Sequence, residues 1–209
     1  MKTKKLSYTQ NSLRTIFIAM FLLIINNANA QSVILDNTFD GDGRVITSPA
    51  SYSSIGRDML IQSDGKIVVA GYGNDGVNPA NLILMRFNTD GSPDNSFDSD
   101  GIVVSNFSAV VNEAHSMALQ SDGKILITGF FYNGADTDVI LARYNTDGSV
   151  DNTFDTDGVV ITDLLGSFEQ AEAIAVQSDG KIVVVGYSDF SGNPDFLILR
   201  YNAEGSLDL

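Results

Sequence analysis

Apolar residues along this chain fall into short β-branched runs that are separated by turn residues. The runs "MLIQ", "MALQ" and "IAVQ" each precede a Ser-Asp-Gly turn, and "KIVVAGY", "KILITGF" and "KIVVVGY" follow it. Runs such as "GRVITS" and "NLILMRFN" complete a set of four, and no ten-residue window beyond residue 30 has a helical period. Short runs rich in Val, Ile, Tyr and Phe predict antiparallel β-strands.

The same set of runs occurs three times. Phe39, Phe97 and Phe154 of "DNTFD", "DNSFD" and "DNTFD" are separated by 58 and 57 residues, and the arginines of the last run by 57. Four antiparallel strands at this period are typical of one blade of a β-propeller. The sequence therefore predicts an all-β, propeller-like repeat of four-stranded antiparallel sheets with three blades.

The repeat divides the chain into a leader at 1–30 and repeats at 31–92, 93–149 and 150–209, the last including the start of a fourth copy in "GSLDL". Together the repeats are expected to form one propeller-like domain. Because propellers usually close with about four to eight blades, three blades predict an incomplete ring. Either the sequence is a piece of a longer product, which we favour, or chains associate to complete a ring.

The Asp-Gly step explains why one phrase is repeated. Asp-Gly between two apolar runs favours a hairpin whose backbone needs positive φ, which glycine adopts without a Cβ clash. We therefore expect Gly65, Gly123 and Gly180 to be fixed by backbone geometry.

The first thirty residues have the pattern of a signal peptide. Lys2, Lys4, Lys5 and Arg14 precede the apolar run 16–25, and "ANA" ends at Ala30. An apolar run of about ten residues is too short to span a bilayer. We expect cleavage after Ala30 and a secreted or cell-surface protein, with no membrane insertion afterwards. The chain has no cysteine, which excludes a disulfide framework.

These repeated motifs resemble the delta-60 repeat of secreted bacterial proteins, and the resemblance covers nearly the whole chain after residue 30. It implies export and a propeller-like scaffold, and no reaction comes with it.

The charge is strongly negative, −14 for the whole chain. Without the leader, eight Lys and Arg stand against 26 Asp and Glu, a formal charge of −18. Such a surface repels nucleic acid and anionic lipid, so neither is an expected partner.

Carboxylates are dense in the repeated "LDNTFDGDG" segments. Calcium prefers several oxygen ligands in a tight loop, and the spacing D-x-x-x-D-x-D-G resembles such loops without matching the EF-hand order. Ordinary Asx turns explain the same residues and are our preferred interpretation, with calcium the only cofactor considered. The candidate ligands are Asp36, Asp40, Asp42, Asp94, Asp98, Asp100, Asp151, Asp155 and Asp157.

Most cations after the leader also occupy repeat positions. We expect each repeated arginine (Arg86, Arg143, Arg200) to pair with a repeated Asp or a carbonyl, and the phenylalanines of the "DNTFD" motif to fill the core between blades. Lys66, Lys124 and Lys181 follow the turns.

Antiparallel connectivity places the repeated turns at one end of the blades and the loops that differ between repeats at the other. Divergent loops are where recognition is expected. The candidate ligand-binding residues are the aromatic side chains of these loops: Tyr52, Phe107, Phe131, Tyr132, Phe168 and Phe190.

Catalysis finds little support, and no catalytic residue is predicted. The single histidine, His115, has no triad or zinc spacing and is expected in a loop, and no nucleophile or nucleotide motif is present. The leading interpretation is an exported, non-enzymatic scaffold that binds an extracellular protein or glycan. The alternatives are a secreted hydrolase with a glycosidase-like carboxylate pair and a calcium-stabilised adhesive or matrix protein.

Overall fold

The computed structural model describes residues 34–49, 53–74, 80–107, 111–164 and 166–209. Within them lie eleven strands and no helix, all in the unit formed by residues 37–209. No helix in the described part of the chain has the length and apolar character needed to cross a membrane.

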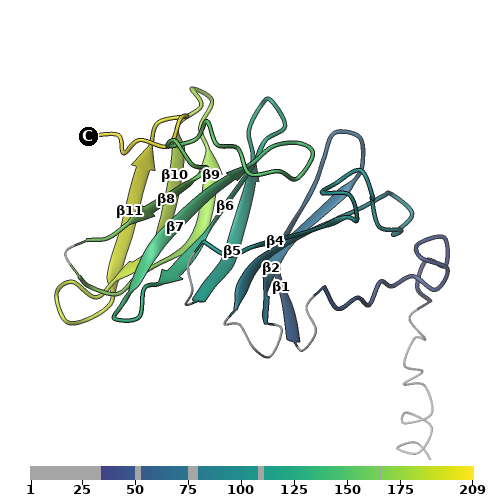
Figure 1. Ribbon diagram of the computed structural model, residues 1–209, viewed down its shortest axis with the longest axis horizontal. Helices are drawn as coiled ribbons and strands as arrows, with labels where there is room; N and C mark the ends of the chain where they lie inside the picture. The colour runs from purple at the N-terminus through teal and green to yellow at the C-terminus, as the bar shows by residue number, and fades with distance from the viewer. Residues whose placement is uncertain (1–33, 50–52, 75–79, 108–110, 165) are drawn as a thin grey trace, which may run out of the picture. The chain divides into compact units, whose positions relative to one another are not determined.

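The strands form three antiparallel sheets, which we call blades 1, 2 and 3 (Figure 1). Blade 1 contains β1 (Ser53–Ile61), β2 (Ile67–Asn74), β3 (Asn81–Phe87) and β4 (Ile102–Ser105). Blade 2 contains β5 (Val111–Leu119), β6 (Ile125–Tyr132), β7 (Thr137–Tyr144) and β8 (Val159–Thr162). Blade 3 contains β9 (Glu169–Val176), β10 (Ile182–Ser188) and β11 (Asp195–Tyr201). The predicted all-β, propeller-like architecture is confirmed, with three blades in an unclosed ring.

The blades are out of phase with the sequence repeat. The run "GIVVSN", expected to open the second unit, forms β4 and pairs with the β3 before it, from Leu82↔Ser105 to Met85↔Ile102. Blade 1 therefore extends across the repeat boundary at residues 92 and 93. The first such run, "GRVITS", was expected to be a strand, and this was wrong for residues 44–48, which form none. In blades 1 and 2 this run pairs with a preceding copy of β3, and the described residues before 44 contain no such strand.

The innermost strands β1, β5 and β9 begin earlier than expected, inside the segments assigned to variable loops. Each of these strands carries a β-bulge, and the bulge of β5 is at His115. At the bulge the backbones approach so closely that a Cβ on Gly129 would overlap the carbonyl oxygen of Glu113. Gly71 and Gly186 stand at the same place in the other blades. The repeated glycine of "AGY", "TGF" and "VGY" is therefore required by a close backbone contact.

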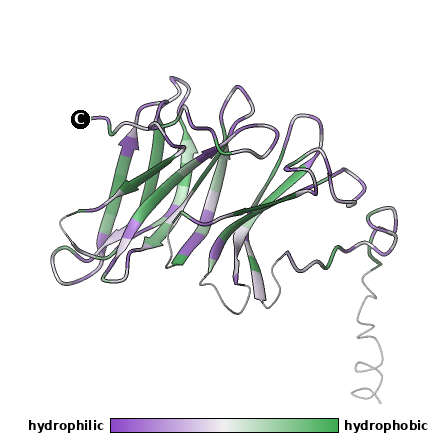
Figure 2. Ribbon diagram, in the orientation of Figure 1, coloured by the Kyte–Doolittle hydropathy of each residue, from purple (hydrophilic) through white to green (hydrophobic). Residues whose placement is uncertain are grey.

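Most of the core lies at the two junctions between blades, and a smaller third cluster in blade 1 contains Ile83, Met85 and Phe87. Strand β7 is buried along its whole length, because its side chains alternate between the two neighbouring blades. Leu126 and Leu141 pack with Ile182 of blade 3, whereas Ile125 and Ile127 pack with residues of blade 1. Figure 2 shows the corresponding hydrophobic colouring along the strands.

A buried arginine connects each of the first two blades with the next one. Arg143 Nε donates to Asp151 Oδ2 at 2.7 Å, and its Nη1 donates to the carbonyl oxygen of Ala203 at 2.8 Å. Its guanidinium lies 4.5 Å from the centre of the fully buried Phe154 ring, and Lys124 Nζ donates to Asp151 at 2.8 Å.

The first copy repeats this arrangement. Arg86 bonds Asp94 and the Thr146 carbonyl, both at 2.6 Å, and lies over Phe97, while Lys66 bonds Asp94. The predicted pairing of the repeated arginines is confirmed, with Arg200 bonded to Asp208. Phe97 and Phe154 lie in the core as predicted, whereas Phe39 is only half-buried.

The carboxyl groups of these networks are held ionised. Burial alone would raise the pKa of Asp151, but hydrogen bonds from Lys124 and Thr153 and the charge of Arg143 outweigh it, so the pKa lies well below its usual range. Asp94 is shifted in the same direction, with Lys66, Ser96 and Arg86 opposing its burial.

Adding a methyl group at two repeated glycines should destabilise the fold to different extents. Gly123 has φ +84°, so Gly123→Ala is expected to cost about 1–2 kcal/mol for a left-handed residue. The cost at Gly129 has a different cause: Gly129→Ala forces two backbones apart and is expected to cost about 3 kcal/mol or more. Urea denaturation of both variants measures the difference, and equal effects would contradict the close approach at the bulge.

Removing the anion of the buried network should be far more harmful in blade 2 than in blade 3. The Arg143 side chain is 8% exposed, whereas the equivalent Arg200, which pairs with Asp208 at 2.6 Å, is 51% exposed. Asp151→Asn leaves a buried cation unpaired, for which about 3–5 kcal/mol is typical. Asp208→Asn is the matched control with a much smaller loss, and similar unfolding free energies for the two variants would contradict this account.

The same carboxyls predict acid sensitivity. Because the folded-state pKa values of Asp94 and Asp151 lie below the ordinary carboxyl value near about 4, the unfolded chain binds more protons as the pH falls. Their contribution is fully present above about pH 5 and is lost progressively below it. Thermal unfolding from pH 7 to pH 3 should show this decline, with a shallower slope in Asp151→Asn.

Candidate ligand-binding site

The strand order places two kinds of connection at opposite ends of the blades. The turns β1–β2, β3–β4, β5–β6, β7–β8 and β9–β10 lie at one end, which we call the repeated end. The connections β2–β3, β4–β5, β6–β7, β8–β9 and β10–β11 lie at the other, which we call the variable end. This is the division expected from the sequence.

The aspartates proposed as calcium ligands at the repeated end have structural partners. Asp42, Asp100 and Asp157 each accept a hydrogen bond from the backbone N–H two residues on, at 3.1, 2.9 and 3.1 Å. Asp94 and Asp151 pair with Lys and Arg.

Three further candidate aspartates form backbone hydrogen bonds in the same loops. Asp40, Asp98 and Asp155 have positive φ and donate their N–H groups to carbonyls at 2.7, 2.8 and 3.0 Å. Asp36 is exposed. No three of these nine aspartates bring carboxylate oxygens together in the described part of the chain.

The predicted aromatic residues separate into buried and exposed members. Tyr52 lies outside the described residues. Phe107 packs against the core between blades 1 and 2, and Phe131 and Tyr132 are half-buried at the end of β6. Two others protrude from loops of the variable end: Phe168 is 46% exposed and Phe190 is 64% exposed.

The loops that carry these two phenylalanines are joined by a pair of hydrogen bonds. The N–H of Phe168 donates to Asp189 Oδ1 at 2.7 Å, and the N–H of Asp189 donates to the Phe168 carbonyl at 3.1 Å. Because Phe190 follows Asp189 directly, both rings are presented from a fixed backbone.

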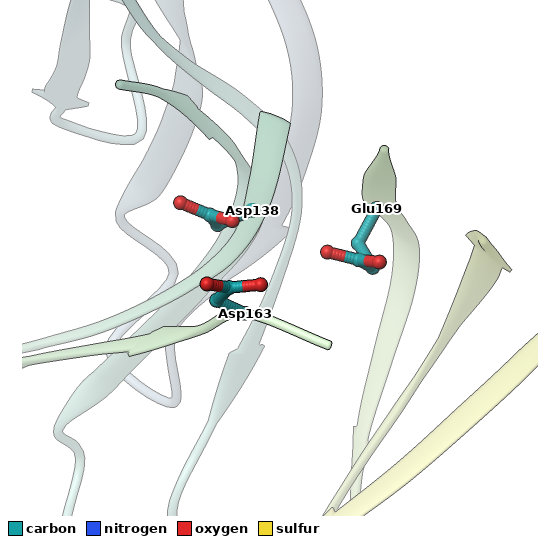
Figure 3. A group of neighbouring side chains, drawn as sticks. All are labelled: Asp138, Asp163 and Glu169. Atoms are coloured by element: carbon teal, nitrogen blue, oxygen red, sulfur yellow. The ribbon is translucent and has the colours of Figure 1, made fainter. Parts of the chain in front are cut away.

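A group of three carboxylates, which we call the acidic triad, lies at the junction of blades 2 and 3. It consists of Asp138 in β7, Asp163 just after β8, and Glu169 at the start of β9. One oxygen from each lies within 4.8 Å of the others, and the three side chains face a shared space (Figure 3). Asp138 and Glu169 are buried, at 3% and 0% exposure, and Asp163 is exposed.

Neutral donors hold part of the acidic triad. Glu169 accepts hydrogen bonds from the hydroxyls of Ser167 and Ser188. Asp163 accepts one from the Gly166 N–H at 2.8 Å. Asp138 Oδ2 accepts one from the Asn133 amide at 3.1 Å, but its Oδ1 is buried and has no hydrogen-bond partner among the described residues.

The charge of the acidic triad is uncompensated by basic side chains. Burial raises the pKa of Asp138, and the negative charges of Asp163, Asp136 and Glu169 raise it further against the hydrogen bond from Asn133. The ion pairs found in the described part of the chain do not include any member of the triad.

The same three positions at the junction of blades 1 and 2 are amides. Asn81, Asn106 and Asn112 stand 57 residues before Asp138, Asp163 and Glu169. Asn81 and Asn112 also carry buried side-chain atoms without a partner among the described residues. Sequence reasoning missed the triad because Asp138 is separated from Asp163 and Glu169 along the chain and belongs to another strand, although the matching positions of two repeats show a change from three amides to three acids.

A pocket lies beside the acidic triad on blade 3. Its lining combines two aromatic rings with carboxylates and hydroxyls: Asp163, Leu164, Ser188, Phe190, Ser191, Asp195 and Phe196.

A second set of polar side chains lies at the bulges of β1, β5 and β9. The unpaired bulge residues are Arg57, His115 and Glu172, one for each blade. His115 was expected in a loop, and this was wrong, since it lies in β5. Its Nδ1 lies 3.4 Å from Glu172 Oε2 and its Nε2 lies 3.8 Å from Glu113 Oε2.

Two of the three bulge residues lie against the aromatic residue that follows the repeated glycine. Arg57 lies 5.1 Å from the Tyr72 ring centre, and His115 meets Phe130 edge-on at 5.6 Å. Burial raises the pKa of Tyr187, with Glu172 contributing. The described residues here provide charge and hydrogen-bonding groups, and the hydroxyl of Ser116, the residue after His115, donates to Asp58 Oδ2 at 2.9 Å.

Comparison with known proteins agrees with the repeat. The model of a family described as "Domain of unknown function (DUF5122) beta-propeller" matches residues 62–97, 120–154 and 177–209, about half of the chain. No curated protein matches. A solved structure of a fucose lectin from Kordia zhangzhouensis in complex with methyl-fucoside is similar over 72% of this chain and 94% of its own, with 12% identity and a TM-score of 0.44. The chain thus carries propeller repeats, one family match for each blade, while the delta-60 resemblance stays a prediction.

Proposed function

We propose that this chain is a non-enzymatic scaffold whose variable end binds a carbohydrate at blade 3. The observation that carries the proposal is the exposed pair Phe168 and Phe190, held by hydrogen bonds next to a pocket of carboxylates and hydroxyls. Exposed apolar side chains that form a patch indicate a binding surface, whereas single ones do not, and Phe190 lines the pocket together with the fully exposed Phe196.

The chemistry of the pocket suits a sugar. A pyranose ring has an apolar C–H face, which packs on an aromatic ring, and hydroxyl groups around its edge. In the pocket, Phe190 provides the ring, and Asp195, Ser188 and Ser191 provide hydrogen-bonding atoms. A few oriented polar groups beside apolar surface are the usual composition of a small-molecule site.

Charge and size narrow the ligand class. A net charge of −14 disfavours sulfated or sialylated glycans, so the proposed ligand is neutral. The apolar surface of two protruding rings is small compared with the roughly 800 Å² that each partner buries in a stable protein interface. A glycan is therefore favoured over a protein as the ligand. The leader-like segment 1–30 supports a place outside the cytoplasm, where such ligands occur.

Binding to a glycan array of neutral and acidic sugars tests this function, followed by calorimetric titration of the strongest binder. Phe168→Ala and Phe190→Ala should each weaken binding by roughly three- to tenfold, the effect of losing one stacked ring. Ile198→Ala is the matched control, because Ile198 is an exposed apolar residue (71%) outside the pocket lining, and it should leave affinity unchanged.

Two results would contradict the proposal. One is the absence of binding to any neutral glycan. The other is the release of sugar products from bound glycans, which would favour the alternative of a hydrolase with a carboxylate pair.

A further inference from the structure

We propose that the acidic triad (Asp138, Asp163 and Glu169) is a binding site for a divalent cation, with calcium as the preferred ion. The proposal goes beyond carbohydrate binding and does not depend on it. It also differs from the calcium hypothesis based on sequence, because none of these three residues belongs to the "LDNTFDGDG" segments.

The geometry of the triad suits a single ion. Three carboxylate oxygens from β7, the β8–β9 connection and β9 lie within 4.8 Å of one another around a shared space (Figure 3). An ion at their centre would connect blade 2 with blade 3. All three donors are oxygens, which calcium prefers, and calcium accepts irregular arrangements that the stricter octahedral geometry of magnesium does not.

A second observation points to a ligand in this space. Asp138 is 97% buried, and its Oδ1 has no hydrogen-bond partner among the described residues. A buried carboxylate oxygen without a donor is costly, because desolvation removes the water that would have satisfied it. A cation satisfies this oxygen and neutralises the negative charge at the same time.

The described part of the chain has no lysine or arginine left for this role. Eight Lys and Arg follow residue 30, and all lie in the described part of the chain. Each is paired with a carboxylate outside the acidic triad. Positive charge at the triad must therefore come from outside the repeats.

The neighbouring junction shows that the architecture does not require this charge. Blades 1 and 2 meet with Asn81, Asn106 and Asn112 at the equivalent positions. A neutral ligand such as water suits those amides. At the second junction, hydrogen bonds from Ser167, Ser188 and Gly166 satisfy part of the carboxylates, and a cation explains the buried Asp138 Oδ1 that they leave without a partner.

Titration with calcium alone tests the site in the intact protein. We expect saturable binding in calorimetry, terbium luminescence that calcium displaces, and weaker competition by magnesium. At free calcium about a hundredfold above Kd, the thermal midpoint should rise by roughly 5–10 °C relative to chelator.

Two triple variants provide the comparison. Asp138→Asn, Asp163→Asn and Glu169→Asn together give the second junction the residues of the first, and this variant should lose the calcium-induced shift. Asp64→Asn, Asp122→Asn and Asp179→Asn together remove the same charge from the repeated end and should keep it. These turn aspartates accept a backbone N–H at about 3.1 Å, which asparagine also does.

The outcomes separate the possibilities. Absence of calcium binding by the unaltered protein overturns the proposal, and so does retention of binding by the variant with the amide junction. If that variant does not fold, Glu169→Gln alone should weaken calcium binding at least tenfold, and unchanged affinity overturns the proposal. Glycan binding is measured separately, so either function can fail without the other.

Discussion

The buried guanidinium that reaches from one blade to the next is the interaction on which this fold depends. Arg143 is satisfied by the Asp151 carboxylate of its own blade and by the Ala203 carbonyl of the following blade. A charge of this burial is tolerated only when its donors are paired, so the arginine, its aspartate and the next turn must appear together. The same set occurs around Arg86, which explains why the repeated phrases include both the turn and the last strand.

Much of this scaffold could be predicted from the sequence because its signals are local. Asp-Gly turns and β-branched runs can be read within one repeat, and the spacing of Arg143 and Asp151 is the same as that of Arg86 and Asp94. The assignment of strands to blades could not be predicted. The composition of the run 102–105 does not show whether it pairs with the strand before it or with the strand after it, and in the structure it pairs with β3 from Leu82 to Met85. The early start of β5 was missed because the bulge at His115 interrupts the alternation that indicates a strand.

The candidate sites were predicted less completely, for a related reason. Aromatic loop residues can be found in a sequence, but exposure distinguishes Phe168 and Phe190 from Phe107, and exposure depends on the neighbouring blade. Asp138 and Glu169 become neighbours only when two blades stack. Such pairs are visible in advance only as aligned positions at which one repeat departs from another.

The two ends of the blades treat buried acid differently, and this difference connects stability with function. At the repeated end, Asp94 and Asp151 receive a lysine and an arginine each from within the chain, and they stabilise the fold without any added component. At the variable end, Asp138 and Glu169 are equally buried and receive only neutral donors. The fold neutralises its buried carboxylates at the repeated end and leaves those at the variable end without a positive partner. A cation is therefore needed at the variable end. The repeated residues already pair with one another and hold the blades together. The residues that differ between repeats, such as the acidic triad, are therefore the ones whose side chains can serve a ligand.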